Sequence, residues 1–219
     1  MDGPQDLGGK SNFGPIAPET DEPIFHADWE GKVLGLTLAV GGLGYWNIDE
    51  GRHLRESLSP IEYYSKTYYE IWYEGLTAGL KKHGELSDDE LSAGKALTPG
   101  VRQDRKVTAE AMPGMLAAGG PSVRQTTQDA RFEVGQTVRT LQAHPPGHTR
   151  LPGYARNKVG VIVGARGMHV FPDTRAHSEG DQPQWLYTVA FEGEALWGKD
   201  AEPGLSCTID AWESYLEAV

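Results

Sequence analysis

The hydrophobic pattern of this chain changes its period near Arg131, and that change constrains the fold more than any other feature. Before it, apolar residues recur every three or four positions, as in the stripe Trp29, Val33, Leu36 and Val40, which is typical of amphipathic helices. After it, short runs rich in β-branched and aromatic residues alternate with turn residues, which favours antiparallel strands. The sequence therefore predicts an α+β protein whose helices precede its strands.

Composition divides the chain into four segments. Residues 1–24 carry many glycines and prolines and no hydrophobic period, so they are predicted to form an extended arm that needs a partner surface to become ordered. Residues 25–97 are predicted to form an all-helical domain, and residues 98–130 a linker. Residues 131–219 contain short strands at a spacing that predicts a small antiparallel β-barrel. The run from Gln184 to Phe191 alternates between apolar and polar residues, which predicts a strand with one buried face.

The charge of the chain is strongly negative, with 31 acidic against 20 basic residues and a formal net charge of -11. An acidic chain is repelled by nucleic-acid phosphates and by anionic lipids, which argues against a general nucleic-acid or membrane binder. Residues 121–175 run against this trend, because they hold eight basic and three acidic residues. This basic block favours a local anionic partner.

Cys207 is the single cysteine, so an internal disulfide is impossible and a cysteine-based metal site within the chain is not expected. The first ten residues show no positive segment followed by an apolar core. The longest apolar run, from Val33 to Trp46, is too short and too rich in glycine to span a bilayer. We therefore expect a soluble, cytoplasmic protein.

The stretch from His144 to Val163 is the main candidate for a functional segment. Its prolines and glycines predict a stiff loop, and a buried strand is predicted to follow it. Between the two stand His148, Thr149 and Arg150. A guanidinium on a rigid support is suited to a planar anion. The alternative interpretation is a surface loop whose arginine only solvates the start of the strand, and this stretch alone leaves both open.

Capping patterns predict three helix starts, at Asn47 with Glu50, at Ser59-Pro60 with Glu62, and at Ser87 with Glu90. On the first of these helices Arg52 stands one turn before Glu56. Its simplest interpretation is an exposed ion pair worth about a few tenths of a kcal/mol. A dense cluster of tyrosines and Trp72 follows, which is most typical of core combined with interface.

No complete catalytic set is visible, since the chain lacks a phosphate-binding glycine loop, a nucleophile elbow and a His-Glu-x-x-His pair. Four histidines between positions 144 and 177 lack the spacing of metal ligands, so no metal site is predicted on this chain. The residues themselves predict a helical part and a β part, completed by another chain. They do not identify a reaction.

Many short segments along the chain resemble, in the same order, those of nitrile hydratase β subunits. The resemblance covers nearly the whole chain except residues 95–130. The segments are MDGPQDLGG, GPI, DEPIFHADWE, DEGRHLRES, TYYEIW, FEVGQTVR, PGHTRLPGYARNKVG, VFPDT, LYTVAF, ALWG and IDAWESYLEA.

The resemblance implies a lyase that converts a nitrile and water to an amide. The expected cofactor is a non-corrin cobalt(III) or a non-haem iron(III), held wholly by a partner α subunit through cysteines of which two are oxidised. This chain is expected to bind no metal, to join the α subunit in an α2β2 heterotetramer, and to act on a small nitrile. The resemblance also implies that the C-terminal half is an SH3-like barrel.

The resemblance assigns roles to particular residues. Arg52 in DEGRH and Arg150 in GHTRLP are expected to hydrogen-bond the oxidised cysteine oxygens, and Tyr68 to line the substrate pocket. Four further residues are expected to line the pocket or to support those that do: His148, Trp72, Leu34 and Ile48. Trp72 and Leu34 replace tyrosines of the iron-type enzymes, which favours cobalt.

Two alternatives stay open. Thiocyanate hydrolase has non-metal subunits that resemble the two halves of this chain encoded separately, whereas here both halves form one polypeptide. A non-catalytic SH3-like scaffold with a helical extension is the other alternative. Co-purification of a cysteine-rich α subunit would distinguish the scaffold from the enzyme.

Overall fold

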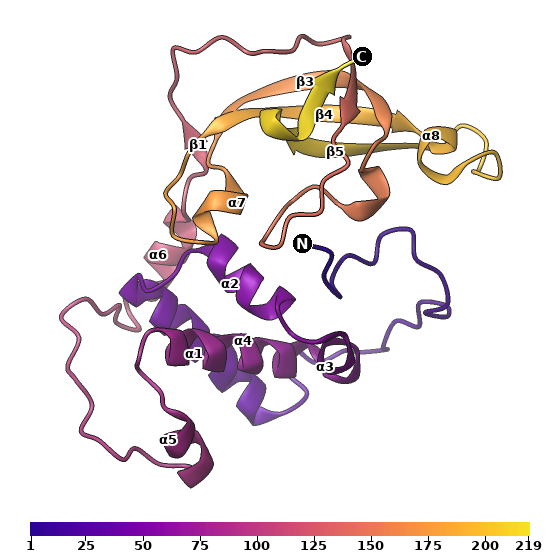
Figure 1. Ribbon diagram of the computed structural model, residues 1–219. Helices are drawn as coiled ribbons and strands as arrows, with labels where there is room; N and C mark the ends of the chain where they lie inside the picture. Colours follow the sequence, from indigo (N-terminus) through magenta and orange to yellow (C-terminus); the bar gives the residue numbers. More distant parts are fainter. The chain divides into compact units, whose positions relative to one another are not determined.

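The computed structural model describes residues 1–219, and the chain divides into two compact units (Figure 1). Gly14–Gly120 form one, which we call the helical unit. Met1–Phe13 and Pro121–Val219 together form the other, the sheet unit. Helices dominate the first and antiparallel strands the second, so the predicted α+β class is confirmed. No helix is long and apolar enough to cross a membrane.

Capping residues start the helices of the helical unit where the sequence predicts them. The side chain of Asn47 accepts hydrogen bonds from the backbone of Asp49 and Glu50, although Glu50 does not complete a capping box. Capping boxes are present at Ser59 with Glu62 and at Ser87 with Glu90. The helices are α1 (Asp28–Leu43), α2 (Ile48–Glu56), α3 (Pro60–Ser65), α4 (Tyr68–Lys82), α5 (Asp88–Ala93) and α6 (Met112–Ala118).

Glycines on α4 let α2 approach it closely. A Cβ atom at Gly75 would lie 2.6 Å from Cγ of Arg55, and one at Gly79 would lie 3.0 Å from Cδ1 of Leu54 and 2.8 Å from the ring of Trp46, which precedes α2. Real Cβ atoms do not come that near to other heavy atoms, so larger residues here would push the two helices apart. Helix α4, which α1 also contacts, is therefore the support of the helix that carries Arg52.

The apolar stripe of α1 is only partly covered within this chain. Val33 is 5% exposed, whereas Trp29 is 39% and Leu36 is 55% exposed. Helix α4 is the main neighbour of α1, and one neighbour cannot cover a helix that is apolar on several sides. The uncovered part of α1 is a surface of the kind that other chains bind.

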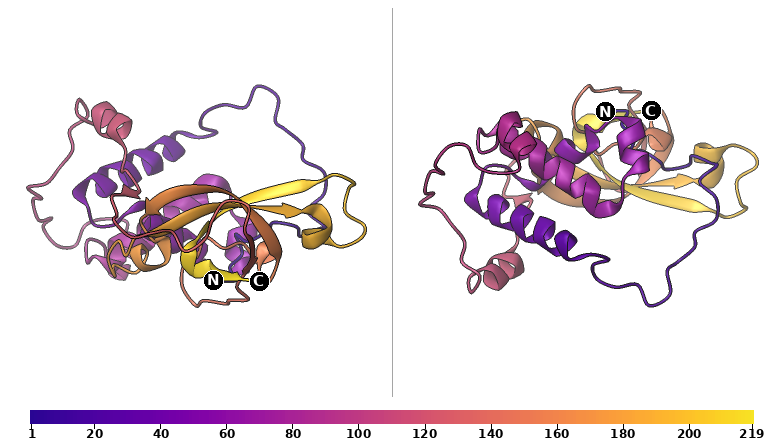
Figure 2. Two further views of the ribbon diagram at one scale, coloured as in Figure 1. Left: turned by 90° about the horizontal axis from the view of Figure 1, so that it is seen from above. Right: turned by 90° about the horizontal axis from the view of Figure 1, so that it is seen from below.

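One antiparallel sheet forms the sheet unit (Figures 1 and 2). Its strand order is β5-β4-β3-β2-β6, and β1 pairs with β3. The strands are β1 (Val123–Arg124), β2 (Thr137–Thr140), β3 (Val159–His169), β4 (Gln184–Glu192), β5 (Ser206–Trp212) and β6 (Leu216–Ala218). The short helices are η1 (Gly153–Ala155), α7 (Pro172–Arg175), α8 (Gly193–Trp197) and η2 (Glu213–Tyr215). Strands β5 and β6, at the two ends of this order, do not pair with each other, so the sheet is open where the sequence predicts a closed barrel. Strand β6 has only 3 residues and pairs with β2 on one side, so its other side gives the sheet only a short unpaired edge.

The burial of β3 and β4 is the reverse of what the sequence predicts. Strand β3, predicted to be buried, alternates: Ile162 is fully buried, but Val161 is 41% and Val163 is 50% exposed. Strand β4, predicted to alternate, is buried continuously from Leu186 to Val189. Side chains of neighbouring strands cover its second face, since Thr188 is hydrogen-bonded by Arg166 and to Asp210. Residue type therefore identified the strands but not which faces would be covered.

The first residues of the chain, Met1–Phe13, belong to the sheet unit and lie against it. The carboxylate of Asp2 accepts hydrogen bonds from the Arg156 guanidinium and from Nδ1 of His144, the latter at 2.6 Å. The carboxylate of Asp6 accepts the backbone N–H of Gly153 at 2.8 Å. Arg156 is buried, so these acidic groups compensate a cation that water hardly reaches.

Acid should release this arm. The hydrogen bond from Arg156, helped by that from His144, lowers the pKa of Asp2 from 3.8 to about 2. Because the pKa is lowered in the folded state, its contribution to docking is present above pH 3.8 and is lost as the pH falls towards 2. Amide-exchange protection of residues 2–7 should fall over that range relative to the strand amides of β3. In Asp2→Asn the protection of these amides should be low and should not change with pH. Equal protection at pH 2.5 and pH 6 in the unaltered chain would contradict the prediction.

Candidate functional site

Both units carry residues that the sequence singles out. The sheet unit carries His148 and Arg150 on the loop between β2 and β3. The helical unit carries the others: Arg52 and Ile48 on α2, Tyr68 and Trp72 on α4, and Leu34 on α1.

Arg150 is presented at the surface by a loop whose neighbouring residues are held inside. Its side chain is exposed and makes no hydrogen bond or ion pair within the chain. Its backbone N–H is different, because it donates to the hydroxyl of Tyr215 at 3.1 Å. His148, two residues before it, is 1% exposed. A fixed backbone below an unpaired guanidinium is the rigid support that the prolines and glycines of this stretch predict.

Arg52 lies on α2 beside a second arginine. Nε of Arg55 donates to the carbonyl oxygen of Gly51 at 3.0 Å, and its guanidinium lies 4.3 Å from the centroid of the Trp72 ring. Burial lowers the pKa of Arg55, and the charge of Arg52 lowers it further. Arg52 itself is half-buried and makes no ion pair within the chain, so the exposed pair with Glu56 is not formed. Arg52 is thus a cation that lies beside a second cation and has no ion pair of its own, which favours binding of an external anion.

Aromatic rings surround this part of the helical unit. The ring of Tyr68 lies 5.3 Å from that of Tyr69 and 5.7 Å from that of Trp72, and Tyr68 is 65% exposed. A hollow of about 30 Å³ lies between α2 and α4, lined in part by Trp72 and Arg55. That volume suits a water molecule and is too small for an organic substrate. Ile48 is exposed and Leu34 half-buried, which leaves apolar side chains available to a partner.

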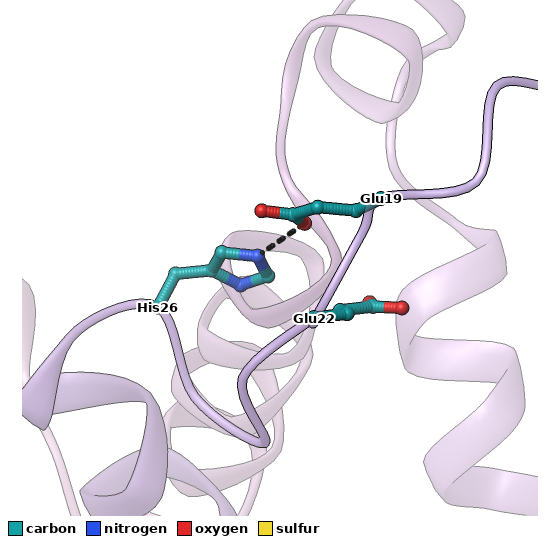
Figure 3. Close-up of side chains that lie close together, drawn as sticks. All are labelled: Glu19, Glu22 and His26. Carbon is teal, nitrogen blue, oxygen red and sulfur yellow. Dashed lines mark hydrogen bonds and ion pairs between the residues drawn. The ribbon is translucent and has the colours of Figure 1, made fainter.

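Glu19, Glu22 and His26 are the one group of three side chains whose ligand atoms lie close enough to share a metal ion, within 4.8 Å of one another (Figure 3). All three are exposed. Nε2 of His26 lies 2.8 Å from the carboxylate of Glu19, and this hydrogen bond raises the pKa of His26. A metal would need the neutral imidazole, which the neighbouring carboxylate disfavours. The group is therefore explained as an exposed ion pair.

Sequence reasoning missed the residues that hold the Arg150 loop. Tyr215 and Asp173 hydrogen-bond beneath it, and Arg156 binds the N-terminal arm beside it. The signals available were a tyrosine within the final short strands, an aspartate after Pro172, and an arginine within the basic block. None of these residue types indicates which distant residue will be its hydrogen-bond partner.

Comparison with known families matches the chain in two consecutive parts. The description "Nitrile hydratase beta subunit, N-terminal" matches residues 1–117, and "Nitrile hydratase beta subunit, C-terminal" matches residues 121–218.

Individual relatives match over the full length. The chain is 39% identical to the low-molecular weight cobalt-containing nitrile hydratase subunit beta of Rhodococcus rhodochrous, covering 99% of both chains. It is 37% identical to a nitrile hydratase subunit beta of Rhodococcus sp, over 100% of this chain and 97% of the relative. It is 32% identical to the cobalt-containing nitrile hydratase subunit beta of Pseudonocardia thermophila, again over 100% and 97%.

Among solved structures, the recombinant apo-enzyme of thiocyanate hydrolase from Thiobacillus thioparus aligns with 61% of this chain and 98% of its own, at 20% identity. The TM-score of 0.40 is too low to support a shared fold or function.

Proposed function

The chain belongs to the nitrile hydratase β-subunit family, and we propose that it is the non-metal subunit of a nitrile hydratase that hydrates small nitriles to amides. It acts only in complex with an α subunit, as an α2β2 heterotetramer. The metal of that complex is cobalt(III), which the cobalt-containing relatives support over iron(III).

One observation carries this proposal: Arg52 and Arg150 present guanidinium groups that have no acidic partner in a chain with 31 acidic residues. Guanidinium groups bind planar, two-oxygen anions through paired N–H donors. Oxidised cysteine ligands of a metal also offer anionic oxygens to such donors, one in a sulfenate and two in a sulfinate. The two arginines donate to them and hold the oxidised sulfurs in place.

The side chains of this chain do not fit the metal itself. Cys207 is the one thiol, and the one cluster with ligand spacing, that of Glu19, Glu22 and His26, is exposed. The metal is therefore assigned to the α subunit, where cobalt(III) would supply Lewis-acid activation of the nitrile or of water.

The remaining residues shape the surroundings of the reacting groups. Tyr68 and Trp72 provide an aromatic wall for the organic part of the nitrile, and their ring spacing of 5.7 Å supports this role. Leu34 and Ile48 add apolar surface next to it. His148, buried under the loop, supports the position of Arg150.

The α subunit covers the apolar surface of α1, which the helical unit leaves exposed at Leu36 and Trp29. The sheet unit is a partly open SH3-like barrel. Its bent strand β3 supports this, since the register with β4 shifts between Ile162 and Gly164 and again between Ala165 and Gly167.

The proposal predicts that the isolated chain holds no stoichiometric cobalt or iron and hydrates no nitrile. The complex with a cobalt-loaded α subunit should hold the metal and hydrate nitriles. Metal analysis and amide formation, measured on the lone chain and on the co-expressed pair, check this. One tightly held ion per lone chain would contradict it. Thiocyanate serves as the second substrate, because hydrolysis of thiocyanate without hydration of any nitrile would replace the proposed reaction. A pair that forms without either activity would indicate a scaffold.

A further inference from the structure

The hydroxyl of Tyr215 lies at the centre of the contacts that hold the Arg150 loop. It accepts the hydroxyl hydrogen of Thr149 at 3.1 Å and the backbone N–H of Arg150 at 3.1 Å, and it donates to the carboxylate of Asp173. A phenol has one donor hydrogen and two lone pairs, so all of its hydrogen-bonding capacity is used. Two of its three partners belong to consecutive residues of the functional loop.

The surroundings of this hydroxyl keep its geometry fixed. Tyr215 is 6% exposed, and its ring packs 5.7 Å from that of Phe171 and 6.0 Å from that of Trp212. Burial raises the pKa of Tyr215, and the charge of Asp173 raises it further, so the phenol keeps its hydrogen. The ring is therefore held by packing, and the direction of the hydroxyl is set by Asp173.

Side-chain packing alone does not fix the position of the loop backbone at Thr149 and Arg150. A cavity of about 180 Å³ lies beside it, lined by Leu141, Pro145, Leu151 and Phe171 together with Thr149, Asp173 and Tyr215. Side chains that border a void of this size lack contacts on that side. Leu151 packs in the core and its carbonyl oxygen accepts from Arg156, whereas at Thr149 and Arg150 the hydrogen bonds to Tyr215 are the connection to the core.

We propose that Tyr215, oriented by Asp173, is the positioning residue for Arg150: its hydroxyl holds the side chain of Thr149 and the backbone N–H of Arg150 and so sets where the guanidinium is presented. This inference rests on the proposed function, in which Arg150 holds an oxygen of the partner's metal site. Tyr215 itself touches no reacting group. A displacement of about 1 Å in such a contact can change a rate about 100-fold.

The chain offers a matched control in Tyr187. Its hydroxyl also accepts hydrogen bonds from two consecutive residues, here the backbone N–H groups of Arg131 at 3.1 Å and of Phe132 at 3.4 Å, and donates to a carboxylate, that of Glu213, at 2.7 Å. Tyr187 is fully buried in the same core. The two tyrosines therefore make the same kind of structural contact, but only Tyr215 makes it to the Arg150 loop.

The experiment compares Tyr215→Phe with Tyr187→Phe in the assembled α–β complex. Both variants should lower the melting temperature by similar amounts, because each loses one hydroxyl with three hydrogen bonds. Tyr215→Phe should also lower kcat by about 10-fold to 100-fold with little change in KM, since Arg150 does not touch the substrate. Amide exchange at residues 149–151 should become about tenfold faster in Tyr215→Phe and stay unchanged in Tyr187→Phe.

The outcomes separate this inference from the proposed function. If Tyr215→Phe keeps the kcat of Tyr187→Phe while Arg150→Lys is inactive, the positioning role is wrong and the proposed function stands. If Arg150→Lys is fully active, the role of Arg150 fails and the inference fails with it. If the Tyr215→Phe chain does not assemble, Asp173→Ala, which keeps the ring of Tyr215 and removes the acceptor of its hydroxyl, is judged by the same two measurements.

Discussion

Arg150→Lys should lower nitrile turnover by the assembled α–β complex by about one to two orders of magnitude while leaving the sheet unit folded, and Arg52→Lys should act similarly. Both changes keep the positive charge and remove the planar fork that can hold two oxygens. A lost charge-assisted hydrogen bond to a desolvated anion costs roughly 1.5–3 kcal/mol, which gives this range of rates. Neither guanidinium has an ion-pair or hydrogen-bond partner within the chain, so stability should change little.

A second arginine of the sheet unit gives the control. Arg139 lies on β2, and its guanidinium pairs loosely with Glu217 at 3.9 Å. Arg139→Lys should leave turnover within about twofold of the unaltered complex, as surface ion pairs of this kind contribute little. Turnover, cobalt content and melting temperature are measured on the same samples. Near-normal turnover in both Arg52→Lys and Arg150→Lys would remove the two arginines from the site.

Gly160→Ala should lower the stability of the sheet unit by roughly 3 kcal/mol, the upper end for forcing extra atoms into a packed core. A Cβ at Gly160 would lie 2.7 Å from the backbone oxygen of Ala190 and 2.8 Å from side-chain atoms of Val189 and Phe191. The backbone of β4 cannot yield without breaking its pairing with β3 and β5. The melting temperature of the complex and its denaturation midpoint measure the loss.

Another glycine on the same strand is the control for this prediction. At Gly164 the nearest atoms to a Cβ belong to the guanidinium of Arg166, at 3.2 Å, which is the far end of a flexible side chain. Gly164→Ala should therefore stay within about 1 kcal/mol of the unaltered chain. Equal losses at the two positions would show that general strand effects, and not the close approach of β4, govern both.

Local patterns predicted the local structure of this protein. The change of period near Arg131 identified the two kinds of unit, and the caps at Asn47, Ser59 and Ser87 identified helix starts, because each depends on residues only a few positions apart. Pairings across the chain were beyond reach. Tyr215 and Asp173 are separated by 42 residues and Arg156 and Asp2 by 154, and no repeating pattern connects them.

The candidate site followed the same division. The Pro- and Gly-rich loop around Arg150 could be predicted to be stiff, since proline restricts the backbone wherever it stands. The roles of Arg52, Tyr68 and Trp72 came from the family resemblance and stay predictions. Which faces of β3 and β4 are covered depends on neighbours that their own residues do not specify, so those assignments failed.

The sheet unit is discontinuous, since it takes Met1–Phe13 from the start of the chain and Pro121–Val219 from its end. The helical unit is therefore an insertion within it. During synthesis the arm emerges first and cannot dock until Arg156 has left the ribosome. Asp2 and Asp6 therefore stay unpaired with the sheet unit while the helices are being synthesised. A protease cut at residue 120 would leave the two pieces held together. The arm belongs to the N-terminal piece, residues 1–120, but stays bound to the C-terminal piece, residues 121–219.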